Sequence, residues 1–263
     1  VMLLAIDVGN TNIVVGLYDG KKLLNVWRLA TNKERTSDEF GVFFLTMFQN
    51  AGLKPDQVKD VIIASVAPNV MYSLRHSIRK FYNTKPILIE PGIKTGLNIK
   101  IDNPRELGAD LIVEAVAAYN MYNGPVVVVD FGTATKLSAV NSRGEFLGVV
   151  ICPGIQVSAD ALTQKAAKLP RIQLAKPKHV IGTNTVDSMQ SGIVHGNVGK
   201  IDYLVKRIKD EMAENGDDRS KIKVVATGGL ARLVTEDMTE IDDVNGLLTL
   251  EGLRLIYEKN KSE

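Results

Sequence analysis

The sequence of 263 residues contains little cysteine and histidine, and it has no excess of charge of either sign. Its single cysteine, Cys152, cannot form a disulfide within the chain, which excludes a disulfide-stapled scaffold. The three histidines lie far apart, with no cysteine or acidic residue at ligand spacing, so we expect no zinc site. The 32 basic and 30 acidic residues nearly cancel, and no strong field therefore favours binding to nucleic acid.

Long hydrophobic runs are also missing. No apolar segment approaches the roughly 20 residues that span a bilayer. The N-terminus shows neither the basic region nor the small-residue cleavage site of a signal peptide. No Walker A or protein-kinase signature is found either. We therefore expect a cytoplasmic protein with no membrane or nucleic-acid partner, whose apolar fraction of 45% supports one large domain or two ordinary ones.

The stretch DVGNTNIVVG, from Asp7 to Gly16, places an acidic residue between an apolar run and a turn. The preceding residues read as an interior strand, where an unpaired carboxylate costs free energy. Asp7 therefore needs a partner, and a metal ion is the first candidate.

The first half of the chain has the pattern of a mixed α/β sheet. A capping box of Thr36 and Glu39 predicts the start of a helix, and Gly52 its end. The other expected elements are strands at 3–7, 12–19, 22–30, 61–67 and 86–90, and a helix at 70–82.

The second half repeats this opening. Residues 125–151 follow the order of residues 3–29, and Asp130 corresponds to Asp7. Further helices are expected at 109–120, at about 154–167 and 185–214 and at the C-terminus, with a strand at 223–229. Two copies of one α/β unit predict two domains, 1–105 and 106–263, that face each other across a cleft.

Each repeated aspartate is followed by glycine and small hydroxyl residues. Such residues let backbone N–H groups approach phosphate oxygens closely, and an aspartate can hold a cation on those phosphates. A third segment, TGGL at 227–230, has two glycines that admit a flat ligand or open a helix N-terminus. The alternative for this segment is a plain strand-to-helix turn.

These motifs resemble those of the acetate and sugar kinase, Hsc70 and actin superfamily. Six segments in order resemble type III pantothenate kinase, the family that includes the Bvg accessory factor. They are DVGNTN at 7–12, DNPRELGAD at 102–110, DFGTATK at 130–136, PGI at 153–155, NTVDSMQSGIVHG at 184–196 and ATGGLA at 226–231. The resemblance implies an α/β fold of two duplicated ribonuclease H-like domains with mixed sheets.

The same resemblance implies the activity. Family members phosphorylate pantothenate with ATP to give 4′-phosphopantothenate, the first step of coenzyme A biosynthesis. They use Mg²⁺ and a monovalent cation, K⁺ or NH₄⁺, and they are homodimers. Helical spacing of Met189, Ile193, Val194, Val198, Ile201, Leu204 and Ile208 fits either the protein core or such a subunit interface.

Site residues are also implied, position by position. Asp110 matches the general base, Asp130 the ligand of the monovalent cation, and Asp7 the aspartate that acts on phosphate through Mg²⁺. The ATP and phosphate site comprises Asp7, Val8, Gly9, Asn10, Thr11, Asn12, Ile13, Val14, Gly132, Thr133, Gly228 and Gly229. The pantothenate site comprises Ile101, Gly108, Ala109, Asp110, Leu111 and Thr185, although Thr185 could instead cap a helix.

Three positions depart from the family pattern. Ile101 stands where Tyr is usual, Leu111 where Arg is usual, and Val149 where Gly is common. The pantothenate half of the site thus lacks two polar groups. Two alternatives follow: a kinase of the same fold for another small alcohol or acid, and a nucleotide-binding regulator without turnover of the Bvg accessory factor type.

Overall fold

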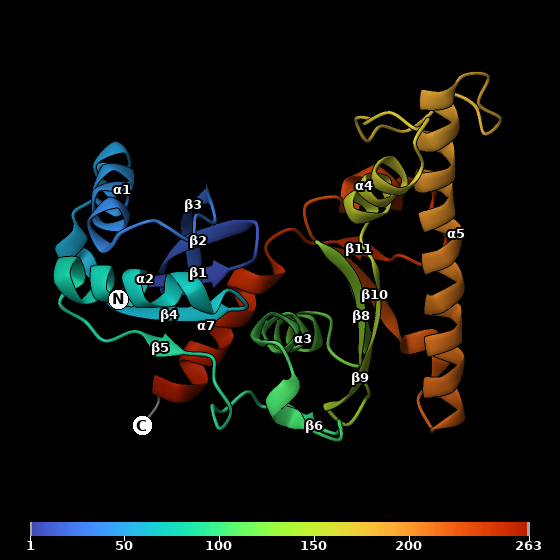
Figure 1. The fold of residues 1–263 in the computed structure, drawn as a ribbon. Coiled ribbons are helices and arrows are strands. Elements are labelled where there is room, and N and C mark those ends of the chain that lie inside the picture. Colours follow the sequence, from blue (N-terminus) through green and yellow to red (C-terminus); the bar gives the residue numbers. More distant parts are fainter. Residues whose placement is uncertain (1, 262–263) are drawn as a thin grey trace. The chain divides into compact units, whose positions relative to one another are not determined.

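The structure is a computed structural model that describes residues 2–261 (Figure 1). Contacts divide it into two compact units, the first of residues 2–96, 103–117 and 248–261 and the second of 97–102 and 118–247. This division differs from the predicted boundary after residue 105, because the last helix, α7 (Leu248–Lys261), packs on the first sheet. A Cβ atom at Gly252 of α7, for example, would lie 2.0 Å from the carbonyl oxygen of Val113 in that unit.

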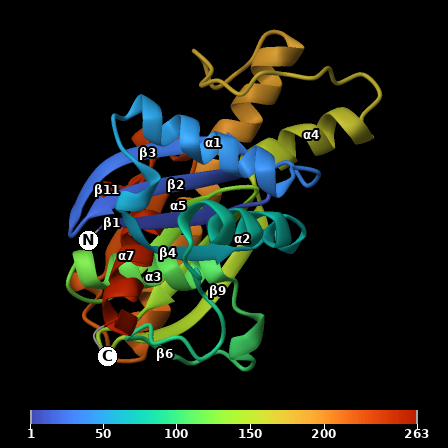
Figure 2. The same cartoon turned by 90° about the vertical axis from the view of Figure 1, so that its left-hand side faces the viewer.

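The first unit is built on a five-stranded sheet of order β3-β2-β1-β4-β5, whose first four strands lie side by side in Figure 2. Strands β1 to β3 are antiparallel neighbours, whereas β4 and β5 run parallel to β1. Their bounds are β1 (Met2–Val8), β2 (Asn12–Asp19), β3 (Lys22–Ala30), β4 (Val58–Ser65) and β5 (Ile87–Leu88).

Two helices form the core of the first unit with one face of this sheet. Helix α1 (Ser37–Asn50) begins at the predicted capping box, in which Thr36 and Glu39 bond each other's backbone N–H groups. Helix α2 (Pro68–Tyr82) ends at Asn83 in the left-handed conformation. Alternate residues of β1, such as Leu4 and Ile6, are fully buried against these helices, as the period of a strand requires. The predicted mixed sheet of the first half is confirmed.

The second unit repeats this order on a six-stranded sheet, β11-β10-β7-β8-β9-β6. As in the first unit, three consecutive strands are antiparallel and a later strand, β10, pairs in parallel with the first of them. The bounds are β6 (Asn98–Ile99), β7 (Val126–Phe131), β8 (Ala134–Val140), β9 (Glu145–Pro153), β10 (Lys223–Thr227) and β11 (Asp243–Val244). The internal repeat that the sequence predicts is therefore present.

The helices of the second unit are α4 (Ile155–Lys165), α5 (Thr185–Glu214) and the short α6 (Ala231–Val234). Helix α3 (Ala109–Met121) begins in the first unit and ends in the second. Residues 2–261 also contain short 3₁₀ turns at Pro55–Gln57, Pro104–Glu106, Arg219–Lys221 and Thr235–Asp237.

Helix α5 runs along the second sheet (Figure 1), and the predicted range 185–214 matches it. Met189, Ile193, Val194 and Ile201 are buried in the core of this unit, which confirms the core interpretation for them. No helix of the described residues is both long and apolar enough to cross a membrane.

Candidate active site

The first predicted phosphate turn lies at the end of β1. Asp7 pairs in register with Val14 of the antiparallel β2, and it lies beside Ala64 of the parallel β4. The turn closes where the Gly9 N–H donates to the Asn12 carbonyl oxygen at 2.9 Å. A Cβ atom at Gly9 would lie only 3.0 Å from that oxygen, so glycine lets the turn close tightly.

Thr31, directly after β3, braces this turn from one side. Its hydroxyl donates to the Gly9 carbonyl oxygen at 2.7 Å, and its N–H donates to the Thr11 carbonyl oxygen at 2.9 Å. The turn is therefore held by hydrogen bonds to two of its carbonyl groups.

The predicted phosphate residues 7–14 differ in their exposure. Val8 and Ile13 are fully buried, so only their backbone groups are available to a ligand, whereas Asn10 and Thr11 are exposed. Asp7 is half-buried at the strand end, which suits Mg²⁺, because this ion binds through one or two carboxylates together with substrate phosphates. The described residues contain no group of three or more His, Cys, Asp or Glu side chains that could hold a metal, and this mode of binding needs none.

Asp110 lies in the first turn of α3. Its Oδ1 atom accepts a hydrogen bond from the Leu111 N–H at 2.8 Å at the N-terminus of this helix. A Cβ atom at Gly108 would lie 2.6 Å from the same oxygen, so a side chain there would displace the carboxylate. That atom would also lie 3.9 Å from Cγ1 of Val66, whose N–H donates to the Val8 carbonyl oxygen at 3.0 Å. The start of α3 therefore lies close to the first turn.

The departures from the family pattern have different surroundings. Leu111 belongs to the first unit and is only 6% exposed, so its side chain is part of the packed interior. Ile101 belongs to the second unit and is partly buried just after β6. Val149 lies in β9 and pairs with Ser138 of β8.

The second predicted turn is centred on Asp130 in β7. This residue pairs in register with Lys136 of β8 on one side and with Thr227 of β10 on the other. Oδ2 of Asp130 lies 2.9 Å from Nζ of Lys136, and the two side chains are 12% and 16% exposed. The second aspartate thus has a cationic side chain beside it in the sheet.

Three motifs meet at this turn through close glycine contacts. A Cβ atom at Gly228, where φ is +94°, would lie 2.7 Å from Oδ1 of Asp130, and one at Gly132 would lie 3.2 Å from Oδ2. A Cβ atom at Gly154 would lie 2.1 Å from the Thr133 carbonyl oxygen. The motifs DFGTATK, PGI and TGGL therefore pack against one another. TGGL also leads into α6, so the strand-to-helix interpretation holds for it as well.

The Lys136 ammonium group already places one positive charge beside Asp130. A metal or ammonium ion bound to Asp130 would therefore be repelled by Lys136. Two like charges 4 Å apart repel each other by about 4 kcal/mol at an effective dielectric constant of 20. The surroundings of Asp130 therefore fit a bound K⁺ or NH₄⁺ poorly. Lys136 was not among the predicted site residues. The pairing could have been found from the hairpin, because a turn of residues 132–134 places Asp130 opposite Lys136.

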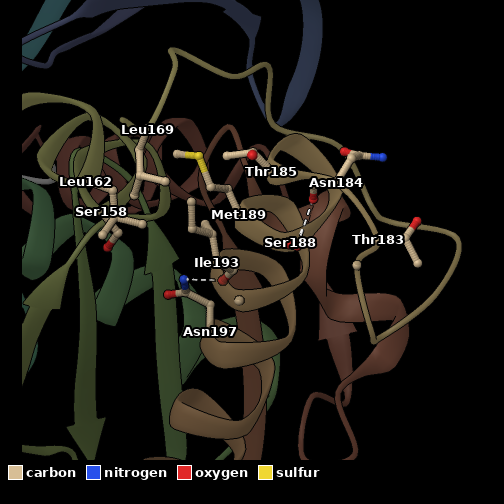
Figure 3. Close-up of a pocket in the computed structure, with 12 residues that line it drawn as sticks. Ser158, Leu162, Leu169, Thr183, Asn184, Thr185, Ser188, Met189, Ile193 and Asn197 are labelled. Carbon is tan, nitrogen blue, oxygen red and sulfur yellow. Dashed lines mark hydrogen bonds between the residues drawn. The ribbon is translucent and has the colours of Figure 1, made fainter. Parts of the chain in front are cut away.

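Thr185, the predicted pantothenate ligand, is the first residue of α5 and is exposed. It does not cap this helix, because the Asn184 side chain accepts the hydrogen bond from the Asp187 N–H at 2.9 Å. Thr185 lies at the edge of a pocket of about 840 Å³ between α4, α5 and the segment before α5 (Figure 3). Apolar groups such as Met189 and Ile193 line this pocket together with polar ones.

Comparison with known proteins identifies the family. The family described as type III pantothenate kinase matches residues 3–207. The chain belongs to this family. The predicted resemblance is therefore confirmed, and it covers both phosphate turns, Asp110 and Thr185.

Solved structures agree with the fold. A protein described as a Baf family transcriptional activator from Campylobacter jejuni is 20% identical with a TM-score of 0.59, and the match covers 99% of this chain and 100% of that one. The activator of 2-hydroxyisocaproyl-CoA dehydratase from Clostridium difficile, solved with bound ADPNP, is 14% identical with a TM-score of 0.52 and coverage of 99% and 96%. A protein described as an N-acetylglucosamine kinase from Porphyromonas gingivalis is 13% identical with a TM-score of 0.51 and coverage of 98% and 99%.

These neighbours show that the chain has the fold of actin-like ATPases and sugar kinases, as the sequence predicts. As a member of the type III pantothenate kinase family it is a transferase of the kinase class that binds ATP.

Proposed function

We propose that this family member transfers the γ-phosphoryl group of ATP to the hydroxyl group of pantothenate, giving 4′-phosphopantothenate for coenzyme A biosynthesis. The observation that carries the proposal is the position of Asp110. Gly108 and Val66 hold the start of α3 close to the Gly9–Asn12 turn within one unit, so a carboxylate base and a phosphate turn lie together. Phosphoryl transfer needs this combination of positioning, charge and a proton acceptor.

In this proposal the first turn binds the phosphates of ATP. Backbone N–H groups of residues 8–14 and the exposed side chains of Asn10 and Thr11 approach the phosphate oxygens. Asp7 holds Mg²⁺, which neutralises charge on the phosphates when it is bound. In the second unit, Gly132, Thr133, Gly228 and Gly229 are the predicted nucleotide-binding residues, because glycine lets backbone approach a ligand closely.

Asp110 acts as the general base. As the hydroxyl oxygen of the substrate bonds to the γ-phosphorus, the bond from that phosphorus to the ADP oxygen breaks, and the hydroxyl proton passes to the Asp110 carboxylate. The Leu111 N–H, which donates to Oδ1, and the close approach of Gly108 orient this carboxylate.

The remaining predicted substrate contacts are Ile101, Leu111 and Thr185. Because Leu111 and Ile101 replace polar residues, the contacts to the substrate carboxylate are weaker than the family pattern provides. A lost hydrogen bond to a charged group costs about 1.5–3 kcal/mol, so we expect pantothenate to bind weakly. The homodimer and the cytoplasmic location stay predictions. The monovalent cation at Asp130 also stays a prediction, and Lys136 weighs against it.

A coupled assay of ADP release, with and without pantothenate, tests the proposal. Release that depends on pantothenate, with a product mass increased by one phosphoryl group, is the expected result. Release with other small alcohols or acids but not with pantothenate would favour a different substrate for the same fold.

Nucleotide binding without any turnover would favour the regulatory alternative. The observation behind that alternative is the likeness to the Campylobacter jejuni protein described as a transcriptional activator, which at 20% identity shows the fold alone.

A further inference from the structure

The ion pair of Asp130 and Lys136 lies in the middle of the second sheet. Strand β7, which carries Asp130, has β8 on one side and β10 on the other, and Lys136 and Thr227 are its register partners there. Nζ of Lys136 lies 2.9 Å from Oδ2 of Asp130, with both side chains more than four-fifths buried. The positive charge is therefore fixed by the sheet and does not depend on a mobile surface side chain.

Stability alone does not account for this pair. Moving two charges out of water carries a desolvation cost that their attraction often only just offsets, and apolar replacements of such pairs are often equally stable. At the matching place of the first unit, the register partner of Asp7 is the apolar Val14. Packing therefore does not explain why the second unit has a lysine, Lys136, at the corresponding position.

The position of the pair supplies that reason. The backbones of Gly132 and Gly228, which belong to the two predicted nucleotide loops of this unit, lie against the two carboxylate oxygens of Asp130. A charge at Asp130 therefore acts on the groups that form both loops. An ammonium group carries the same charge as K⁺, and its three N–H donors can bond the carboxylate and a further oxygen at once.

We propose that the Lys136 ammonium group is the built-in cation of the nucleotide site at Asp130, so that nucleotide binding by this protein does not depend on K⁺ or NH₄⁺. The inference rests on the proposed function only as far as ATP binding, and it does not require pantothenate. Lys136 is thus a positioning residue that orders the loops around Asp130.

The test measures the dissociation constant of ADPNP with Mg²⁺ by titration calorimetry. Wild type and Lys136→Ala are compared in potassium, ammonium and tetramethylammonium chloride at one ionic strength. Wild type should bind equally well in all three salts. Lys136→Ala should bind at least about tenfold more weakly in tetramethylammonium, because a charged hydrogen-bond partner is lost, and should recover when K⁺ or NH₄⁺ enters the space.

Lys176→Ala is the matched control, since Lys176 forms an ion pair with Asp237 elsewhere in the same unit at 2.7 Å. It should behave as wild type in every salt. The wild-type measurement needs no variant, so the inference remains testable even if Lys136→Ala fails to fold.

Wild-type binding that tightens about tenfold in K⁺, a difference of about 1.4 kcal/mol, would overturn the inference and leave the proposed function intact. The inference would also be overturned if a folded Lys136→Ala variant bound ADPNP as tightly as wild type does in tetramethylammonium chloride. Absence of nucleotide binding in all three salts would overturn the inference and the proposed function together.

Discussion

The two Asp-x-Gly turns of this chain differ in what faces the aspartate. Asp7 has the apolar Val14 as its register partner across the sheet, whereas Asp130 has Lys136. The loops are also held differently: Thr31 braces the first by hydrogen bonds, and Gly154 supports the second by direct backbone contact. Duplication thus preserved the strand order and the carboxylate, while the surroundings decide what each carboxylate can bind.

The difference suggests two separate tasks. The task proposed for Asp7, which is half-buried at the end of β1, is to hold Mg²⁺ together with the phosphates of ATP. A carboxylate next to an ammonium group already has its counter-ion. The first turn, moreover, has the Asp110 carboxylate held nearby at a helix start.

The largest effect that separates the two turns should come from Asp110→Asn. Loss of the general base should lower turnover by about a hundredfold to ten-thousandfold, while nucleotide affinity stays near that of wild type. Steady-state rates combined with calorimetry of ADPNP binding check both parts. Near wild-type turnover in this variant would remove Asp110 from the chemistry.

Asp7→Asn should have the next largest effect. With one carboxylate charge removed, the Mg²⁺ concentration for half-maximal turnover should rise by about tenfold or more, in line with the loss of a charged contact. Asp130→Asn is the matched control, because it makes the same chemical change in the other turn and should leave the Mg²⁺ dependence near that of wild type. Equal Mg²⁺ shifts in both variants would mean that the two turns share one task.

Gly154→Ala should destabilise the second turn. Its Cβ atom would lie 2.1 Å from the Thr133 carbonyl oxygen, which is backbone and cannot rotate away. We expect a loss of about 1–3 kcal/mol in the free energy of unfolding, the usual cost of overpacking. Urea unfolding measures this loss. Gly199→Ala in α5 is the control, since no atom lies within 4 Å of its added Cβ, and helix propensity should make it up to about 1 kcal/mol more stable.

The smallest effect concerns pH and is confined to the first unit. Although partial burial alone would raise the pKa of Asp60, bonds from Lys261 and Tyr257 of α7 hold this pKa below its usual value. A lowered pKa in the folded state stabilises the protein above the unfolded value of about 3.9, and this stabilisation is lost as the pH falls through the folded value.

The Asp60 contribution should be no more than about 1 kcal/mol, as for other partly exposed pairs. Unfolding of wild type and Asp60→Asn at pH 7 and pH 3 measures it: the difference between the two should be smaller at pH 3 than at pH 7. A difference that persists undiminished at the lower pH would contradict the assignment.

Much of the fold could be predicted because its signals are local. The capping box at Thr36 depends on residues three apart, and the range of α5 depends on helical spacing along one segment. The repeat was visible because Asp7 and Asp130 each end a similar apolar run. These features need no knowledge of distant contacts.

The features that escaped prediction depend on partners far apart in the sequence. The predicted boundary at residue 105 ignored α7, whose place on the first sheet follows from contacts such as that of Gly16 with Leu250. The role of Lys136 depends on the register of a hairpin, which an added or missing turn residue would change. Likewise, the burial of Leu111 could not be read from its place after Asp110, since position in a helix does not reveal what covers it.

The discontinuous first unit affects how the chain matures during synthesis. Residues 97–102 and 118–247 emerge from the ribosome before α7, so the whole second unit is available to fold while the first still lacks this helix. Until residues 248–261 emerge, the side of the first sheet that includes Tyr18 has no Glu251 to bond and no helix over it. That side of the sheet is then the part of the nascent protein most open to chaperones and to aggregation.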